Sequence, residues 1–104
     1  MAPPDPIADL DDLLHTKARL GIMTVLTTLG TADFSTLKRE LALTDGNLGA
    51  HLRVLEEAGY VDVDKAFVDR KPRTTCSVTP AGRRAFTAYL AQLEAVIRQA
   101  RKKR

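Results

Sequence analysis

The sequence predicts an α+β domain that is mainly helical. Three features favour this class: apolar residues recur at helical spacing over most of the chain, apolar and acidic residues alternate from Val61 to Asp64, and the pair Thr79–Pro80 is typical of a helix start. A chain of 104 residues supports one hydrophobic core. We therefore expect a flexible, proline-rich tail over residues 1–6 and a single folded domain over residues 7–104.

The first part of the chain predicts a short amphipathic helical segment and then a longer helix. The short segment runs from Ile7 to Leu14 and opens with acidic residues, which the positive end of a helix dipole favours. From about Thr16 to Leu29, apolar residues recur every three or four positions and form one stripe. Gly30 then occupies a position where helices commonly end.

Two further helices are joined by a tight turn. Asp33 is a suitable N-cap for a helix over residues 34–41, and Thr44 is one for a helix over roughly residues 45–58, which ends before Gly59. In each helix the leucines share one face and polar residues occupy the other. This arrangement predicts a helix-turn-helix over about residues 34–58.

A β-hairpin is expected next, over about residues 60–79. Its first strand contains the alternating valines, and its second strand is expected from Thr74 to Val78. The connecting loop, residues 67–73, is polar and basic and contains Pro72. The hairpin therefore has a positively charged tip.

The last helix, about residues 80–101, has an apolar stripe wider than a small domain can cover by itself. The opening segment 7–14 is also apolar on one side. We expect these two elements to pair across a twofold axis in a homodimer, which would bind a palindromic site. The expected interface residues are Leu10, Leu13, Leu14, Phe86, Tyr89, Leu90, Leu93, Val96 and Ile97.

The stretch Leu48–Val61 (LGAHLRVLEEAGYV) closely resembles the recognition helix and first wing strand of ArsR- and MarR-type bacterial regulators. Three further stretches, Arg19–Met23, Phe34–Lys38 and Thr79–Arg83, resemble the opening helix, the first helix of the helix-turn-helix and the start of the helix after the wing. The resemblance covers about residues 16–86. It implies a winged helix-turn-helix with a two-stranded β-hairpin wing and a C-terminal dimerisation helix, and a transcription regulator that binds double-stranded DNA.

The recognition helix and the wing are the expected DNA contacts. Leucines that face inward leave the opposite face for DNA, and the N-terminal residues of such a helix lie nearest the bases. Asn47 suits adenine, Arg53 suits guanine or a phosphate, and the Ala50 methyl group suits thymine. The candidates are Thr44, Gly46, Asn47, Ala50, His51 and Arg53 in the helix, Arg70, Lys71 and Arg73 in the wing, and Lys38 and Arg39 as phosphate contacts.

Two questions stay open in the recognition helix. His51 lies on the flank of the helical wheel, where a DNA contact and a half-buried packing role are both compatible with the sequence. Gly46 and Gly49 stand where the family often has serine or threonine, and each costs on the order of 1 kcal/mol of helix stability relative to alanine. Either DNA or the preceding helix would come close to the backbone at these glycines.

Charge is divided unevenly along the chain, whose net charge is +3. Residues 1–64 carry 5 basic and 11 acidic side chains, whereas residues 65–104 carry 11 basic and 2 acidic ones. The basic part predicts contact with a polyanion, although a solvated surface would have the same composition. The same two interpretations apply to the terminal cluster of Arg98, Arg101, Lys102, Lys103 and Arg104.

Sequence motifs of other functional classes are missing. There is no glycine-rich phosphate loop, and Cys76 has no histidine in its motif, so we expect no catalytic residue and no cofactor. One cysteine and two separated histidines cannot form a thiolate metal site, which leaves only a site of His15 with Asp11 or Asp12 shared across a dimer. The single cysteine, the lack of a signal peptide and the lack of an apolar run of ~18 residues predict a cytoplasmic protein without membrane contact.

We expect a repressor, because the chain contains no second domain that could contact polymerase. The operator sequence and the identity of any small-molecule effector are not readable from the residues. The alternative function is a winged-helix module that contacts RNA or protein. The five aromatic residues disfavour RNA, since most are expected in the core and provide no base-stacking surface: Phe34, Tyr60, Phe67, Phe86 and Tyr89.

Overall fold

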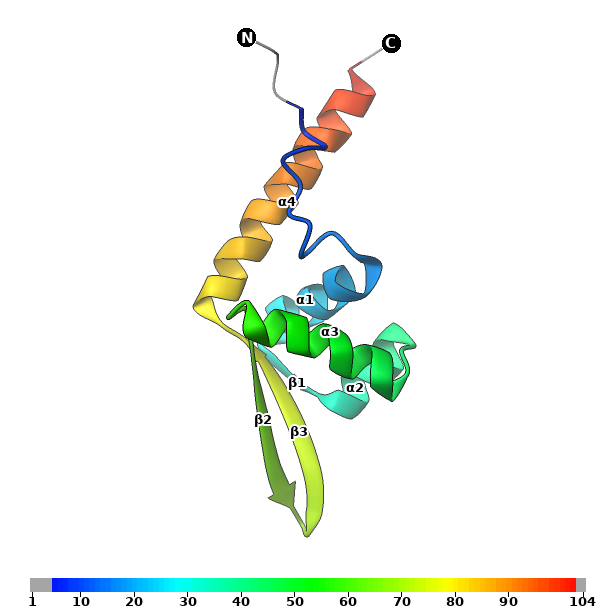
Figure 1. Cartoon of the computed structure of the whole chain (residues 1–104), viewed down its shortest axis with the longest axis vertical. Coiled ribbons are helices and arrows are strands. Elements are labelled where there is room, and N and C mark those ends of the chain that lie inside the picture. Colours follow the sequence, from blue (N-terminus) through cyan, green and yellow to red (C-terminus); the bar gives the residue numbers. More distant parts are fainter. Residues whose placement is uncertain (1–4, 103–104) are drawn as a thin grey trace.

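The computed structural model describes residues 5–102, so that most of the predicted tail and the basic residues 103 and 104 lie outside the described residues. The molecule is elongated, about 60 × 24 × 22 Å, with the last helix at one end and a β-hairpin at the other (Figure 1). The order of elements is α1 (Lys17–Leu29), β1 (Thr31–Asp33), α2 (Phe34–Leu41), α3 (Asp45–Glu57), β2 (Val61–Val68), β3 (Lys71–Val78) and α4 (Pro80–Arg101). The predicted α+β class is confirmed.

Each helix begins where the sequence places a capping residue. A side-chain oxygen at the cap accepts a hydrogen bond from a backbone N–H in the first turn, which has no partner within the helix. The caps of α1 to α4 are Thr16, Asp33, Thr44 and Thr79, which accept from the N–H groups of Arg19, Thr36, Asn47 and Gly82, respectively. Local chemistry therefore sets the helix starts.

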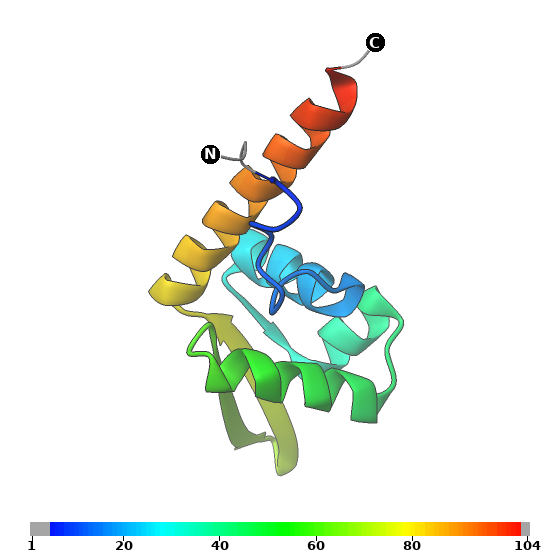
Figure 2. The same ribbon diagram turned by 45° about the horizontal axis from the view of Figure 1, so that its top comes forward.

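The segment before α1 forms turns, so the helix expected over residues 7–14 is wrong. Asp11 accepts hydrogen bonds from the backbone N–H groups of Leu13 and Leu14, and its own N–H donates to Gln92 of α4. The Nδ1 atom of His15 lies 2.7 Å from the hydroxyl of Tyr89 on the same helix. Because the aspartate captures backbone groups that a helix would need, the segment follows α4 as an irregular strap (Figure 2).

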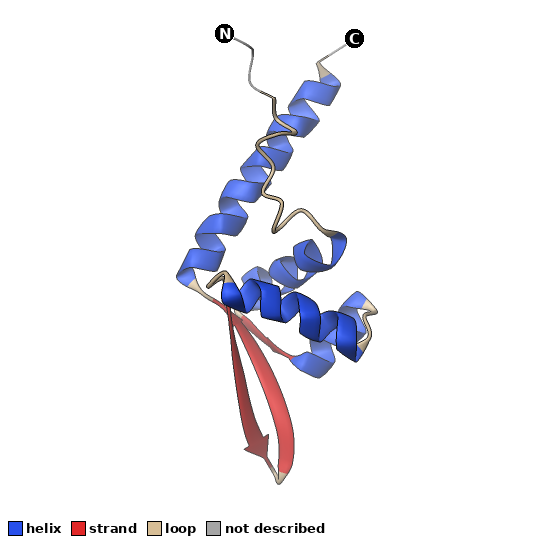
Figure 3. Cartoon of the chain, in the orientation of Figure 1, coloured by secondary structure: helices blue, strands red, loops and turns tan. Residues whose placement is uncertain are grey.

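The sheet has three antiparallel strands in the order β1-β3-β2, one more than the predicted hairpin contains (Figure 3). The three residues of β1 pair with Thr75–Ser77 of β3. A strand of this length carries no readable alternation in the sequence, and only its partner in space makes it a strand. It ties the end of α1 to the base of the hairpin.

The strands of the hairpin are longer and its turn is tighter than expected. The strands are joined by Asp69 and Arg70 alone, both with positive φ (52° and 66°), as in the type I′ turns that suit the twist of a hairpin. Lys71 and Arg73, predicted in a loop, therefore belong to β3. Pro72 pairs with Phe67, one residue pair before the turn. This is a non-hydrogen-bonded pair of the antiparallel ladder, so the N–H group that proline lacks is not needed for pairing.

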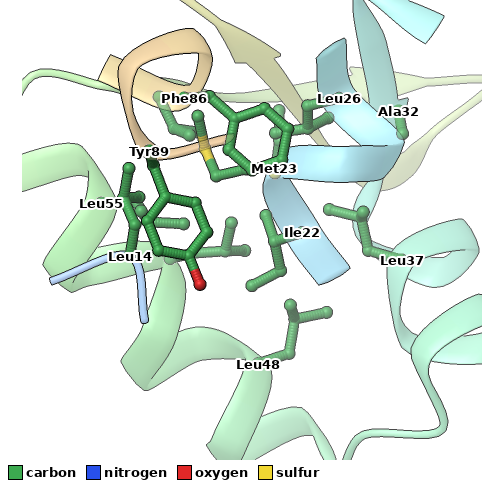
Figure 4. Packing of buried hydrophobic residues seen from close by; sticks show 13 residues of the cluster. Leu14, Ile22, Met23, Leu26, Ala32, Leu37, Leu48, Leu55, Phe86 and Tyr89 are labelled. Carbon is green, nitrogen blue, oxygen red and sulfur yellow. The ribbon is translucent and has the colours of Figure 1, made fainter. Parts of the chain in front are cut away.

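Helices α1, α2 and α3 form the helical body of the molecule. The core lies between this body, the base of the hairpin and the first half of α4 (Figure 4). Leu14, Phe86 and Tyr89, which we expected at a dimer interface, are almost fully buried within the single chain. The expectation is corrected for these three residues, because surface already covered inside one chain is not available to a second one. Cys76 is also buried, and burial raises the pKa of its thiol to about 11.

Candidate nucleic-acid interface

Helix α3 presents a leucine face to the core and a polar face outward. Leu48, Leu52 and Leu55 are buried. The outward face includes five of the residues proposed from the sequence, and all are exposed: Thr44, Gly46, Asn47, Ala50 and Arg53. The structure therefore brings most of the predicted recognition-helix contacts together on one accessible surface.

The two glycines of α3 lie in open space. A Cβ atom built on Gly46 or Gly49 would meet nothing within 4 Å among the described residues. Close packing against the preceding helix, one of the two explanations for these glycines, is therefore wrong. The backbone of the outward face is left unusually accessible, with no side chain at either position.

His51 is half-buried on the flank of α3, as the helical wheel predicted. Its Nδ1 atom lies 3.0 Å from Nη1 of Arg19, whose Nε donates to the carbonyl oxygen of Leu13. A guanidinium can only donate, so Nδ1 of His51 is the acceptor in this contact. Of the two roles left open for His51, these contacts favour packing.

Helix α2 places both of its candidate cations in exposed ion pairs. Nζ of Lys38 lies 2.8 Å from a carboxylate oxygen of Asp45, the first residue of α3, and both side chains are largely exposed. Such a surface pair stabilises the fold by only about 0–1 kcal/mol, and it holds Lys38 beside the start of the recognition helix. Arg39 is exposed on the same helix, and its Nε atom lies 4.0 Å from Oε2 of Glu40.

The wing, defined here as residues 61–78, extends beyond the helical body (Figure 1). Arg70, Lys71 and Arg73 are all exposed, as expected. Arg73 lies near Asp33, whose pKa is lowered first by hydrogen bonds from Thr36 and further by the charge of this arginine. The predicted wing cations are thus presented at the end of the molecule furthest from the end of α4.

Lys65 and Phe67 are exposed residues of the wing that were not among the predicted contacts. They share a face of β2 with Val61, which is buried, and with Val63. Phe67, which was predicted in the loop and grouped with aromatic residues expected mostly in the core, belongs to β2 and is exposed. The lysine that follows Val63 on the same face was the available signal that the core ends there.

An open groove of about 540 Å³ separates α3 from the wing. Two cations line the groove, Arg53 from α3 and Lys65 from β2. Glu56 is the acidic residue of the lining. The groove joins the outward face of α3 to the wing. Both elements therefore border one continuous surface.

The structure shows which contacts the residues of the alternative metal site make. No group of three or more His, Cys, Asp or Glu side chains able to hold a metal ion occurs within residues 5–102. Asp11 and His15, two members of the alternative shared site, are engaged with backbone N–H groups and with Tyr89, respectively. In the same part of the chain no helix is long and apolar enough to cross a membrane.

The α2–α3 pair followed by the β2–β3 hairpin defines a winged helix-turn-helix protein. Residues 18–97 match the family described as a winged helix DNA-binding domain, and the chain belongs to this family. The predicted fold is thereby confirmed.

Similar proteins include transcriptional regulators. A solved "transcriptional regulator homologue protein" from Pyrococcus horikoshii OT3 is 40% identical, with a TM-score of 0.80 over 86% of this chain and 88% of that chain. An uncharacterized protein of Methanocaldococcus jannaschii is 36% identical over 78% of this chain and 88% of its own length. A MarR-family transcriptional regulator from Silicibacter pomeroyi, 21% identical, shares the fold with a TM-score of 0.61 over 86% of this chain and 60% of that chain. The chain is a homologue of winged-helix transcriptional regulators.

Proposed function

We propose that this protein is a transcriptional repressor that binds a palindromic operator in duplex DNA as a homodimer. The observation that carries the proposal is the exposed polar face of α3 next to a basic, projecting wing. A helix of this kind fits the major groove, and the adjacent hairpin then reaches the flanking minor groove or phosphates. Occupation of a promoter by such a dimer would block transcription.

The recognition contacts follow from the exposed side chains of α3. Asn47 would form paired hydrogen bonds with adenine, Arg53 would bind guanine or a phosphate, and the Ala50 methyl group would contact thymine. Lys38 and Arg39 would contact phosphates beside the start of α3. The wing would add Arg70, Lys71 and Arg73.

Apolar side chains left uncovered on the single chain support the homodimer. Leu90 and Ile97 of α4 are 41% and 48% exposed, and Ile7 of the strap is 60% exposed. Leu90 and Ile97 are seven positions apart and lie on one face of the helix. The proposed interface therefore consists of these residues with the less exposed Leu10, Leu13, Leu93 and Val96.

The first test is a fluorescence-anisotropy titration of a random-sequence duplex pool at two salt concentrations, with single-stranded RNA as competitor. Replacing Arg70 and Arg73 by alanine should weaken binding ~10- to 100-fold and lower the slope of log affinity against log salt by about 2, because two cationic contacts are removed. The double variant Lys17→Ala/Arg84→Ala removes the same charge from exposed sites on α1 and α4 and is the control. A folded wild-type protein that does not bind duplex at low salt would overturn the DNA proposal.

Gly49→Ala should separate stability from DNA affinity. The added methyl group meets open space and favours the helix, so the free energy of unfolding should rise by roughly 1 kcal/mol and the Tm by about 4–8 °C. The same methyl group would lie between the α3 backbone and DNA, so affinity should fall several-fold. Thermal unfolding and anisotropy measure the two effects. Unchanged affinity would mean that DNA does not approach α3 at this position.

A further inference from the structure

The tip of the wing, defined here as residues 67–72, carries a large uncovered aromatic side chain. Phe67 is 78% exposed, more than any other large apolar residue exposed on the described chain. Its partner across the hairpin is Pro72, the last apolar pair before the turn on that face. Single exposed apolar residues are common on protein surfaces, so the exposure alone decides nothing.

The position of Phe67 within the wing gives it a defined orientation. Side chains alternate along β2, so Phe67 lies on the face that also carries Lys65, Val63 and the buried Val61. Farther back on this face, Val63 and Lys65 line the groove beside α3. The ring is therefore presented on the side of the wing that borders the recognition helix.

The hairpin that carries the ring of Phe67 is stiff. Two eight-residue strands are paired along their whole length, and the connecting turn contains only two residues. Pro72 opposite the ring has a fixed φ and adds an apolar backing at the close distance of a non-hydrogen-bonded pair. A ring held in this way loses little conformational entropy when it enters a narrow site.

The charges around Phe67 select the kind of partner. Lys65, Arg70, Lys71 and Arg73 are exposed on the wing, whose acidic members are Asp62, Asp64 and Asp69. A second copy of this wing would carry the same net positive charge and be repelled, whereas the phosphates that line a DNA groove would be attracted. An aromatic ring within a basic, projecting hairpin matches the apolar wedges that enter the minor groove between base pairs.

We propose that Phe67 acts as such a wedge: when α3 occupies the major groove, the ring enters the adjacent minor groove, partly unstacks one base step and bends the duplex. This inference rests on the proposed DNA-binding function. Pyrimidine–purine steps unstack most easily, so the wedge would make the protein prefer TA or CA/TG at a position that no polar side chain reads. Phe67 would thereby contribute specificity without a hydrogen bond to a base.

The test is a selection from a random duplex library, carried out in parallel with wild type, Phe67→Ala and Val68→Ala. Val68 is the matched control, because it is an exposed apolar residue of the same tip that lies on the opposite face. Wild type and Val68→Ala should enrich the same flexible step at a fixed distance from the α3 site, and Phe67→Ala should lose that preference. On the duplex enriched by wild type, Phe67→Ala should bind about tenfold more weakly with an unchanged salt slope, because no charge is removed.

Bending is measured on the same duplex by energy transfer between dyes at its two ends, and folding of each variant by thermal unfolding. Loss of the bend in Phe67→Ala alone supports the wedge. Equal enrichment, affinity and bending for wild type and Phe67→Ala would overturn it and leave the DNA-binding proposal intact. A change in oligomeric state of Phe67→Ala would also overturn it by assigning the ring to a protein contact. Failure of wild type to enrich any duplex would refute the proposed function itself.

Discussion

Replacing Gly82 by alanine should destabilise the domain by about 3 kcal/mol or more, the largest effect that we expect from a change of one small residue. Gly82 lies in the first turn of α4 and is buried. A Cβ atom at this position would lie 2.2 Å from the carbonyl oxygen of Tyr60 and 2.9 Å from its carbonyl carbon. Both are backbone atoms, so no side-chain rotation can relieve the overlap.

Hydrogen bonds hold the backbone of Tyr60 in place on both sides. Its N–H donates to the carbonyl of Leu55 at the end of α3, and its carbonyl accepts from Thr79, the cap of α4. Relief of the overlap would therefore move α4 away from α3 and from the start of the wing. Thermal unfolding followed by circular dichroism should show a Tm at least about 12 °C lower, given roughly 4–8 °C per kcal/mol for a domain of similar size.

Gly46→Ala is the matched control for Gly82→Ala, because it makes the same chemical change early in a helix but in open space. Its Tm should stay level or rise, as expected from the helix propensities of the two residues. A Tm of Gly82→Ala within a few degrees of wild type would contradict the close approach of α4 to Tyr60.

The double variant Leu90→Glu/Ile97→Glu should be monomeric and should bind a palindromic duplex at least ~100-fold more weakly than wild type. Two carboxylates on the exposed apolar face of α4 would be buried without partners in a dimer, which is strongly unfavourable. A monomer engages one half-site at a time and loses the gain of about 10² to 10⁴ that comes from linking two binding modules. Sedimentation at micromolar concentration and anisotropy on a selected palindromic duplex measure the two effects.

Ala88→Glu/Gln99→Glu is the control for this second prediction. Both residues are exposed on α4, and the helical repeat places them on the side opposite Leu90 and Ile97. The change in charge is the same, so the general repulsion from DNA is matched. A wild-type protein that sediments as a monomer would refute the proposed homodimer. An equal loss of DNA affinity in both double variants would mean that the added negative charge, and not the loss of the dimer, weakens binding.

The amino-acid sequence by itself determined the elements whose causes are local. The four caps start the helices because each supplies an oxygen to N–H groups three residues away. The leucine spacing in α3 established which face is buried, and the exposed positions of Asn47, Ala50 and Arg53 follow from it. The order of helix-turn-helix and hairpin, and with it the winged-helix fold and most of the candidate contact surface, could be predicted for this reason.

Only the tertiary structure decided features that depend on partners distant in sequence. Strand β1 exists because β3 pairs with it, and the strap before α1 is irregular because Gln92 and Tyr89 of α4 bind it. Leu14 is apolar whether it packs on its own chain or on a second one, so its spacing alone could not exclude a dimer contact. The spacing of apolar residues in the sequence shows that a side chain prefers burial, whereas the packing of the folded chain decides which surface covers that side chain.

The same distinction explains the errors on the wing and in α3. Phe67 was predicted in the loop, yet it belongs to β2 because β3 pairs with it beyond the alternating valines, and it is exposed there. Gly46 and Gly49 fitted close packing and DNA approach equally well until the structure showed the space beside them to be open. Hydrophobic preference and backbone freedom are properties of a residue, whereas the presence or absence of a neighbour is a property of the fold.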